Sequence, residues 1–343
     1  MNLLDPRAKG RFLRHRGARV GLVLVGLIVV FAVVAPLFAG QDPLHSDFAA
    51  GATVDGLPAA PSGVHWLGTD RLYRDVFARL AYGARISLLV GVVATVIATV
   101  IGAAVGIVAG YYEGSDGVRI PWVSVTGLVL GLVTLVLGHP QAAMVLVFVS
   151  AAIGLAGGLQ SIEPLRAGPR LDADTALMRL VDVGLSFPFL LLVMALGAAL
   201  DKTSVTTIFL TLGLTGWLGT ARIVRAKTLQ VRNLEFVLAA RALGRPTLAI
   251  LLRHILPNVA GPLVVLATAS VAQMILAESA LSYLGAGIAP PTPTWGHMLY
   301  EGQDNYTAAP WLLAAPAISI LVTVLGFNLV GEGLRDALDP RAQ

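Results

Sequence analysis

The chain has 343 residues, of which 56% are apolar and only 13% are charged, and its mean hydropathy is +0.78. Soluble domains carry about 25% charged residues, so this composition indicates an integral membrane protein. The absence of cysteine excludes disulfides, thiolate catalysis and Cys-ligated metals. The net charge is +4, but the basic residues cluster in loops between apolar runs, which is typical of topology control rather than of nucleic-acid binding.

Apolar runs long enough to cross a bilayer, about 20 residues each, recur along the chain. We predict six core spans, at 18–39, 85–110, 178–200, 204–222, 260–284 and 310–331. Two shorter runs, 120–137 and 141–159, predict an additional hairpin. We therefore expect an all-α polytopic membrane protein with six core transmembrane helices plus an inserted transmembrane hairpin. The first run exceeds the usual signal-peptide core of about 7–15 residues, which favours an uncleaved anchor.

The same pattern suggests four parts of the chain. They are a basic tail with the first span and a loop (1–64), an outer amphipathic helix with the second span (65–117), the inserted hairpin (118–171), and the remaining core helices with a polar loop at 222–258 (172–343). Most of the 24 Lys and Arg residues precede the first span or lie in the even-numbered connections, and residues 286–309 contain none. The positive-inside rule then places both termini in the cytoplasm.

The loop 222–258 is polar and strongly basic although it lies between two apolar spans. Within it, residues 235–244 predict a short amphipathic helix with Asn233 as N-cap and Gly244 at its end. Phe236, Ala240 and Leu243 follow at i, i+4 and i+7 and predict one apolar stripe. An interfacial helix held on anionic lipid by arginines is one interpretation, and a helix that meets a soluble partner is the other.

Two further segments, 67–88 and 290–299, are predicted on the opposite side of the membrane. Asp70 with Arg74, and Asp75 with Arg79, have the i,i+4 spacing of ion pairs on a helix. Trp295 lies in a proline-rich loop and suits the membrane interface. Glu278 lies within an apolar span, where an ionisable group indicates either a pathway or a hydrogen-bonded packing role.

Several segments, in the right order, resemble the permeases of ABC importers. The EAA motif of that family reads Glu-Ala-Ala, three residues, Gly, and later Leu-Pro; Ala239, Ala240, Gly244, Leu256 and Pro257 match it, and Leu238 replaces the glutamate. The segments LGTDRLYRDVFARLAYGARISL (67–88) and PPTPTWGHML (290–299) resemble two further signatures of the dipeptide/oligopeptide branch, specifically of its C-type subunit. The resemblance covers about 65–117 and 172–341, and not 118–171.

This resemblance implies a transmembrane permease subunit of a binding-protein-dependent importer, most simply one for dipeptides or oligopeptides, in the cell inner membrane. It implies a helix that couples to an ATPase (Glu235, Ala239, Ala240, Arg241, Gly244) and a surface that faces the partner permease and the binding protein (Asp70, Arg74, Asp75, Trp295). The possible pathway or gate role of Glu278 rests on its place in an apolar span, and a packing role is favoured over it. The implied partners are a homologous second permease, two cytoplasmic ATPase subunits, a periplasmic or lipid-anchored substrate-binding protein and membrane lipid, without nucleic acid. ATP and Mg²⁺ would be bound by the ATPases, and this chain would hold no cofactor or metal and have no catalytic residue.

The sequence is less consistent with two other functions, those of an enzyme and of a stand-alone secondary transporter. Each lysine (Lys9, Lys202, Lys227) lacks the preceding glycine of a P-loop, so the chain offers no Walker A site of its own. Asp172 and Asp174 could suggest a membrane glycosyltransferase, but Asp174 suits a helix cap and no acidic cluster accompanies it. A stand-alone secondary transporter usually shows internal repeats, and no convincing repeat is present.

Overall fold

The computed structural model describes residues 6–54, 56–114, 118–119, 145–146, 170–171, 173–200 and 204–338. The chain divides into two compact units, one formed by residues 1–107 with 183–343 and the other by residues 108–182. The predicted hairpin at 118–171 lies almost entirely outside the described residues. At its two ends, β1 (Val118–Arg119) pairs antiparallel with β2 (Arg170–Leu171), so these two points of the second unit are neighbours.

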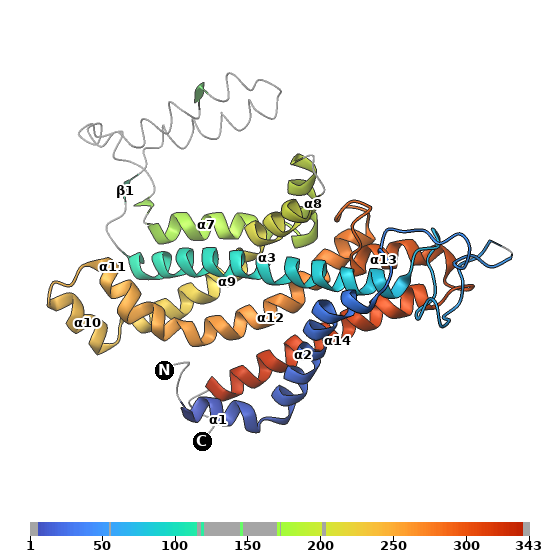
Figure 1. Ribbon diagram of the computed structural model, residues 1–343. Coiled ribbons are helices and arrows are strands. Elements are labelled where there is room, and N and C mark those ends of the chain that lie inside the picture. Colours follow the sequence, from blue (N-terminus) through green and yellow to red (C-terminus); the bar gives the residue numbers. More distant parts are fainter. Residues whose placement is uncertain are drawn as a thin grey trace. The chain divides into compact units, whose positions relative to one another are not determined.

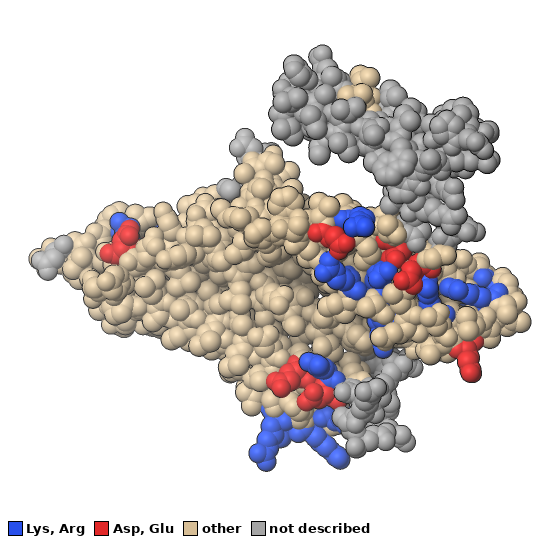
Figure 2. All heavy atoms as spheres, turned by 180° about the vertical axis from the view of Figure 1, so that it is seen from behind, with Lys and Arg blue, Asp and Glu red and all other residues tan. Residues whose placement is uncertain are grey.

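Within the described residues, five helices are long and apolar enough to cross a membrane. They are α2 (Arg16–Phe38), α3 (Val76–Tyr112), α9 (Val205–Arg232), the continuous helix Thr247–Tyr283 and α14 (Trp311–Leu338). Each of these five helices overlaps a predicted span, which confirms the all-α polytopic class. Figure 2 shows charged atoms gathered toward the ends of the long helices, with a broad uncharged face between them.

The predicted span 178–200 is not one straight helix. α7 (Ala173–Ser186) and α8 (Phe189–Ala199) are separated by a short break and bend by 94°. Pro188 lies at the break; it has no N–H to donate and it disfavours helical dihedrals in the preceding Phe187. The predicted span therefore corresponds to a bent pair of helices that together are long and apolar enough for one broken span. Apolarity alone does not show where a helix bends.

The shorter elements lie at the ends of the first unit (Figure 1). α10 (Glu235–Ala242) is at one end, and the 40–75 loop with α13 (Trp295–Gly302) and the 3₁₀ turn Gln303–Asn305 is at the other. α1 (Pro6–Arg14) packs against α2 and α14, and α2 and α14 lie side by side.

Near Pro36 of α2, a side chain of another helix satisfies backbone carbonyl groups that the proline leaves without a helical partner. Because proline cannot donate, the carbonyl of Ala32 loses its usual helical partner. Arg85 of α3 takes that place: its Nε donates to the Ala32 carbonyl at 2.7 Å and its Nη2 donates to the Val33 carbonyl at 2.9 Å. The side chain also stacks on Tyr82. A cation at this position therefore fastens α3 to α2.

Glycines lie where neighbouring helices come closest to each other. A Cβ at Gly106 of α3 would lie 2.5 Å from the Ala221 carbonyl of α9, and one at Gly102 would lie 2.7 Å from the Thr220 Cβ. The two glycines have the small-xxx-small spacing of close transmembrane contacts. On the other side of the unit, Gly21 of α2 and Gly326 of α14 meet in the same way.

We expect Gly106→Ala to destabilise the folded subunit by about 1–3 kcal/mol, because the added methyl overlaps the α9 backbone. Gly26→Ala in α2 is the matched control, since a Cβ there meets nothing within 4 Å. Thermal unfolding of both variants in detergent measures the difference. Equal stability of the two variants would contradict the described α3–α9 contact.

Candidate functional site

The connection between α9 and α10 differs from the sequence-based expectation. Asn233 was expected to cap the short helix, but it ends α9 instead, and its side-chain amide donates to the Leu229 carbonyl at 3.2 Å. Leu234 occupies the N-cap position of α10 and forms no side-chain capping bond. Asn233 does not cap α10 because its side-chain amide already forms a hydrogen bond with α9.

The other end of α10 agrees with the prediction. Gly244 adopts a left-handed backbone conformation with φ of 69°. Its N–H donates to the Arg241 carbonyl at 2.9 Å, and the Arg245 N–H donates to the Ala240 carbonyl at 3.2 Å, which together form a Schellman motif. Glycine adopts this conformation without the penalty of a Cβ. The prediction that Gly244 ends the helix is confirmed.

The apolar stripe predicted on α10 is wrong in its direction. Val237 and Ala240 are the buried side chains of the helix, whereas Phe236 and Leu243 are exposed. Ala240 is only 6% exposed and packs against its own chain, while the neighbouring Ala239 is exposed. Of the two motif alanines, Ala239 is therefore the one whose side chain a partner can approach. Glu235 and Arg241 are also exposed on this helix.

After α10 the chain returns to the membrane as a continuous helical rod. α11 (Thr247–Ile250), the π-helical turn Leu251–Ile255 and α12 (Leu256–Tyr283) join without a gap. Pro257 follows the π-turn, in which the Leu256 N–H donates to the Leu251 carbonyl. A π-turn accommodates a proline that an ideal α-helix would not, because it absorbs the displaced carbonyls. A displacement of α10 would thus reach a membrane-spanning helix through the turn at 243–246 alone.

At the opposite end of the unit, the loop before α3 is held by a buried ionic cluster. The Asp70–Arg74 pair forms, with Nε and Oδ2 2.7 Å apart, but it lies in a turn and not on a helix. Arg79 of α3 is 1% exposed and contacts Asp70 and Glu301 rather than Asp75. The predicted outer helix at 67–88 is likewise absent: residues 67–75 form a loop, and residues from Val76 onward belong to α3.

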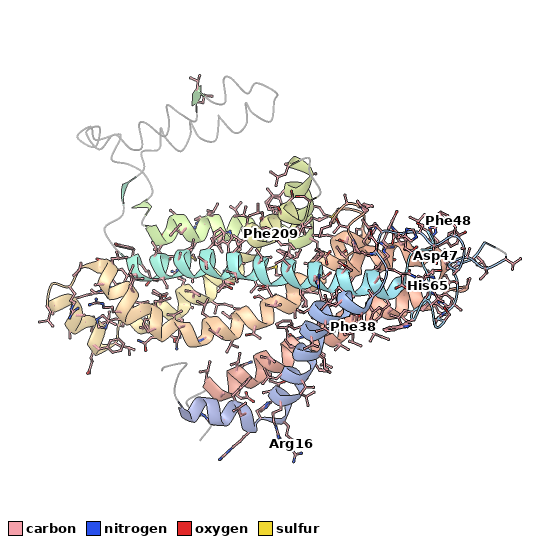
Figure 3. All side chains as sticks on the ribbon, in the orientation of Figure 1. Arg16, Phe38, Asp47, Phe48, His65 and Phe209 are labelled. Carbon is pink, nitrogen blue, oxygen red and sulfur yellow. The ribbon has the colours of Figure 1, made fainter. Side chains whose placement is uncertain are left out.

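Asp75 has two other contacts. Its Oδ1 accepts from the Ala78 N–H at 2.7 Å and thereby caps α3, and its Oδ2 lies 2.9 Å from Nδ1 of the fully buried His65. The other ring nitrogen of His65 is 3.5 Å from Asp47. Figure 3 shows Asp47, Phe48 and His65 together at the end of the unit that carries the 40–75 loop. This histidine therefore ties the loop to the start of the helix.

Glu301 of α13 completes the ionic cluster from more than 200 residues away. Its Oε1 accepts from Nη2 of Arg74 at 2.8 Å and lies 3.3 Å from Nε2 of His297. Burial alone would raise the pKa of Glu301, but the hydrogen bond with His297, the charge of Arg79 and the hydrogen bonds from Arg79 and Arg74 outweigh it and hold the pKa well below its usual 4.5. Glu301 and His297 were not predicted from the sequence, because nothing local marks a carboxylate as the partner of a distant arginine.

This lowered pKa predicts acid sensitivity. The contribution of Glu301 to stability is complete above its unfolded pKa of about 4.5 and is lost as the pH falls through its lower folded value. We expect thermal stability to decline as the pH is lowered from about 5, with a shallower decline in Glu301→Gln, which has no proton to bind at this position. Identical acid limbs in the two proteins would show that Glu301 is not ionised in the folded state.

Two predicted site residues prove to be internal to the chain. Trp295 is fully buried, and its Nε1 donates to the Leu80 carbonyl at 3.2 Å, so the expectation of a membrane-interface side chain was wrong. Glu278 is also fully buried; the hydroxyls of Ser87 and Ser282 lie 3.2 and 2.9 Å from its carboxylate oxygens. These bonds fit the packing role that was considered for Glu278, and its pathway role stays a prediction. Buried side chains also include Asp70, Arg74 and Asp75. That the loop which contains them faces a partner protein stays a prediction.

A mostly apolar cavity of about 610 Å³ lies where the α7–α8 break meets α9 and α12. Gly216 and Gly219 of α9 form part of its wall, and Gln273 and Leu276 of α12 lie on another side. The cavity is thus bordered by the same α12 into which the α10 loop continues. Movement of that helix would change the shape of the cavity.

These features define a polytopic membrane protein in which a short loop helix is joined by a four-residue turn to a span beside a cavity. Residues 165–343 match the family described as binding-protein-dependent transport system inner membrane component, and residues 7–55 match the N-terminal TM domain of oligopeptide transport permease C. The chain therefore belongs to the binding-protein-dependent transport permeases, and the resemblance predicted from the motifs is confirmed. The match at 7–55 extends it to the first span, where no motif had been recognised.

Individual relatives cover nearly the whole chain. It is 35% identical over 331 residues to the oligopeptide transport system permease protein OppC of Bacillus subtilis, spanning 96% of this chain and 88% of that protein. It is 36% identical over 334 residues to OppC of Escherichia coli K12, spanning 97% and 90%. The dipeptide transport system permease protein DppC of Bacillus subtilis is 36% identical over 332 residues, spanning 96% and 84%. The chain is thus a transport permease of the ABC importer class.

Proposed function

We propose that this subunit forms part of the membrane pathway of an importer for dipeptides or oligopeptides. The observation that carries the proposal is the short turn at 243–246 that joins α10 to the continuous helix Thr247–Tyr283, which borders the cavity of about 610 Å³. The names of the relatives, oligopeptide and dipeptide permeases, support the substrate class. Nothing in the cavity itself selects one peptide length.

The working cycle that we propose is a two-state gate driven from outside the chain. Closure of two cytoplasmic ATPase subunits on bound ATP and Mg²⁺ displaces α10, and the rigid rod Thr247–Tyr283 carries that displacement into the bundle. The pathway then opens toward a substrate-binding protein, periplasmic or lipid-anchored, and hydrolysis restores the inward-facing state. A homologous second permease supplies the other half of the pathway. This chain supplies no cofactor, metal or catalytic residue.

The proposed location is the cell inner membrane, with both termini and α10 in the cytoplasm. The basic loop 222–258 and the basic residues before α2 support this orientation, because Lys and Arg are retained on the cytoplasmic side. Membrane lipid surrounds the long helices, and nucleic acid is not a partner. The stand-alone carrier and the glycosyltransferase are not favoured, since the chain belongs to a permease family whose transport depends on a binding protein.

Reconstitution tests this function. Proteoliposomes that hold both permeases and both ATPases should take up labelled peptide only with ATP and the binding protein, and omission of this chain should abolish uptake. Peptide uptake by this chain alone, driven by an ion gradient, would instead support the secondary carrier.

A further inference from the structure

A second cavity, of about 700 Å³, lies where α2 ends and the 40–75 loop begins, at the end of the first unit opposite α10 (Figure 1). Three segments form its wall: the end of α2 with the turn that follows it (36–44), an early part of α3 (82–86) and the proline-rich loop 291–293. Its volume is within the range of small-molecule sites, about 300–1,000 Å³. The proposed transport cycle makes no use of this cavity.

The cavity presents one cation and one anion. Arg85 is held in place because its Nε and Nη2 donate to the Ala32 and Val33 carbonyls of α2, and its Nη1 donates to no described residue. Asp42 accepts from the Leu44 N–H through Oδ1 at 2.9 Å, and its Oδ2 accepts from no described residue. Two opposite charges with unused hydrogen-bonding capacity fit a zwitterionic ligand better than a singly charged one.

Gln41 adds an acceptor beside Asp42. Its side chain lines the same cavity, and its Oε1 is buried without a hydrogen-bond partner among the described residues. An unpaired buried carbonyl is costly, so each such group in a folded protein needs an explanation. Rotation of the amide about its last torsion would present Oε1 to the same ligand cation that meets the Asp42 carboxylate.

The cavity is continuous with an apolar stripe on α2. Leu37, which lines the cavity, is 76% exposed, and Val33 and Val30, about one and two turns along the helix, are each 57% exposed. Exposed apolar side chains on a membrane-spanning helix form a surface along which acyl chains can lie. A charged cavity that joins such a stripe indicates a phospholipid rather than a soluble peptide.

The lining of the cavity distinguishes among phospholipid headgroups. A quaternary ammonium such as choline has no N–H, and proteins recognise it with aromatic cages. Tyr82 is the aromatic side chain of this lining, and Arg85 already lies over its ring, 5.4 Å from the centre. A purely anionic headgroup would bring a like charge to Asp42. A primary ammonium can donate to Asp42 while the phosphate beside it accepts from Arg85.

We propose that this cavity binds phosphatidylethanolamine, with the phosphate at Arg85, the ammonium at Asp42 and an acyl chain along Leu37. The site is independent of which substrate the transporter carries. The bound lipid bridges α2, α3 and the loop 291–293, which are far apart in sequence. Because it binds only the folded arrangement of these segments, it stabilises that arrangement.

The experiment uses the full transporter in detergent, titrated with short-chain phosphatidylethanolamine, phosphatidylcholine or phosphatidylglycerol, and counts bound lipids by native mass spectrometry. The wild-type transporter should bind one phosphatidylethanolamine about fivefold more tightly than either of the other lipids, the factor that one ion pair of about 1 kcal/mol supplies. Asp42→Asn should remove this preference and leave the affinity for phosphatidylcholine unchanged. It keeps an oxygen for the Leu44 N–H, and it leaves the bonds from Arg85 to α2 intact.

Asp304→Asn is the matched control. Asp304 is an exposed carboxylate at the same end of the unit, paired with Arg71 and outside the cavity, so its removal should leave lipid binding as in the wild type. Equal wild-type affinities for the three lipids, or an unchanged preference in Asp42→Asn, would overturn the proposal. Displacement of phosphatidylethanolamine by a soluble dipeptide would overturn it as well and would assign the cavity to peptide.

Discussion

Arg79→Met should cause the largest loss of stability of any single substitution considered. Arg79 is 1% exposed and contacts Asp70 and Glu301, so its removal leaves one buried and one half-buried carboxylate with Arg74 as their remaining arginine. Deleting one partner of a buried ionic group typically costs about 3–5 kcal/mol. We expect the apparent Tm of the subunit in detergent to fall by roughly 10 °C.

Two variants test the cause. Arg71→Met removes an arginine from the exposed pair with Asp304 in the same region and should cost about 1 kcal/mol or less. Combining Arg79→Met with Glu301→Gln removes one positive and one negative charge and should recover part of the lost stability. An Arg79→Met protein as stable as Arg71→Met would contradict the buried cluster.

Ala239→Arg should cause the largest loss of transport. Ala239 is exposed on α10 between Leu238 and Leu243, so a long charged side chain there would hold the helix away from the ATPase without disturbing the fold. We expect ATP-dependent uptake to fall more than tenfold, equivalent to about 1.4 kcal/mol or more of lost coupling, while membrane insertion and thermal stability stay normal. Uptake and ATP hydrolysis in the reconstituted complex provide the measurement.

Ala239→Ser is the control, because it keeps the side chain small and should transport normally. Ala240→Arg is a poorer test, since Ala240 is buried and the substitution would unfold the loop itself. Unimpaired, ATP-dependent uptake by Ala239→Arg would mean that this face of α10 does not meet the ATPase.

The long spans could be predicted because each corresponds to a continuous run of apolar residues in the sequence. The run at 310–331, for example, coincides with α14 from Trp311 onward, and the glycine at 244 ends its helix as expected. The bend between α7 and α8 was missed because the run 178–200 is apolar on both sides of Pro188. Hydropathy predicts which segments can lie in lipid, but it does not predict the direction of the helix axis.

The candidate site was less predictable because its partners are distant in sequence. Asp70 and Arg74 pair as their spacing suggested, but the turn that brings them together and their contacts with Arg79 and Glu301 depend on the tertiary fold. Trp295 was placed at the membrane interface because its residue type favours that location, whereas it is buried in a core cluster with residues of α3, α12 and α14. On α10, the direction of the buried face follows from α9 and α11, which an eight-residue helix does not encode by itself.

We propose that the ATPase moves this subunit through α10. The chain has no cysteine, so Ala239→Cys introduces a single thiol to which a short photo-activated cross-linker can be attached. In the intact transporter we predict adducts with the ATPase subunit whose yield changes when ATP is added, and loss of uptake once they form. Adducts with lipid alone, unchanged by ATP, would contradict the account.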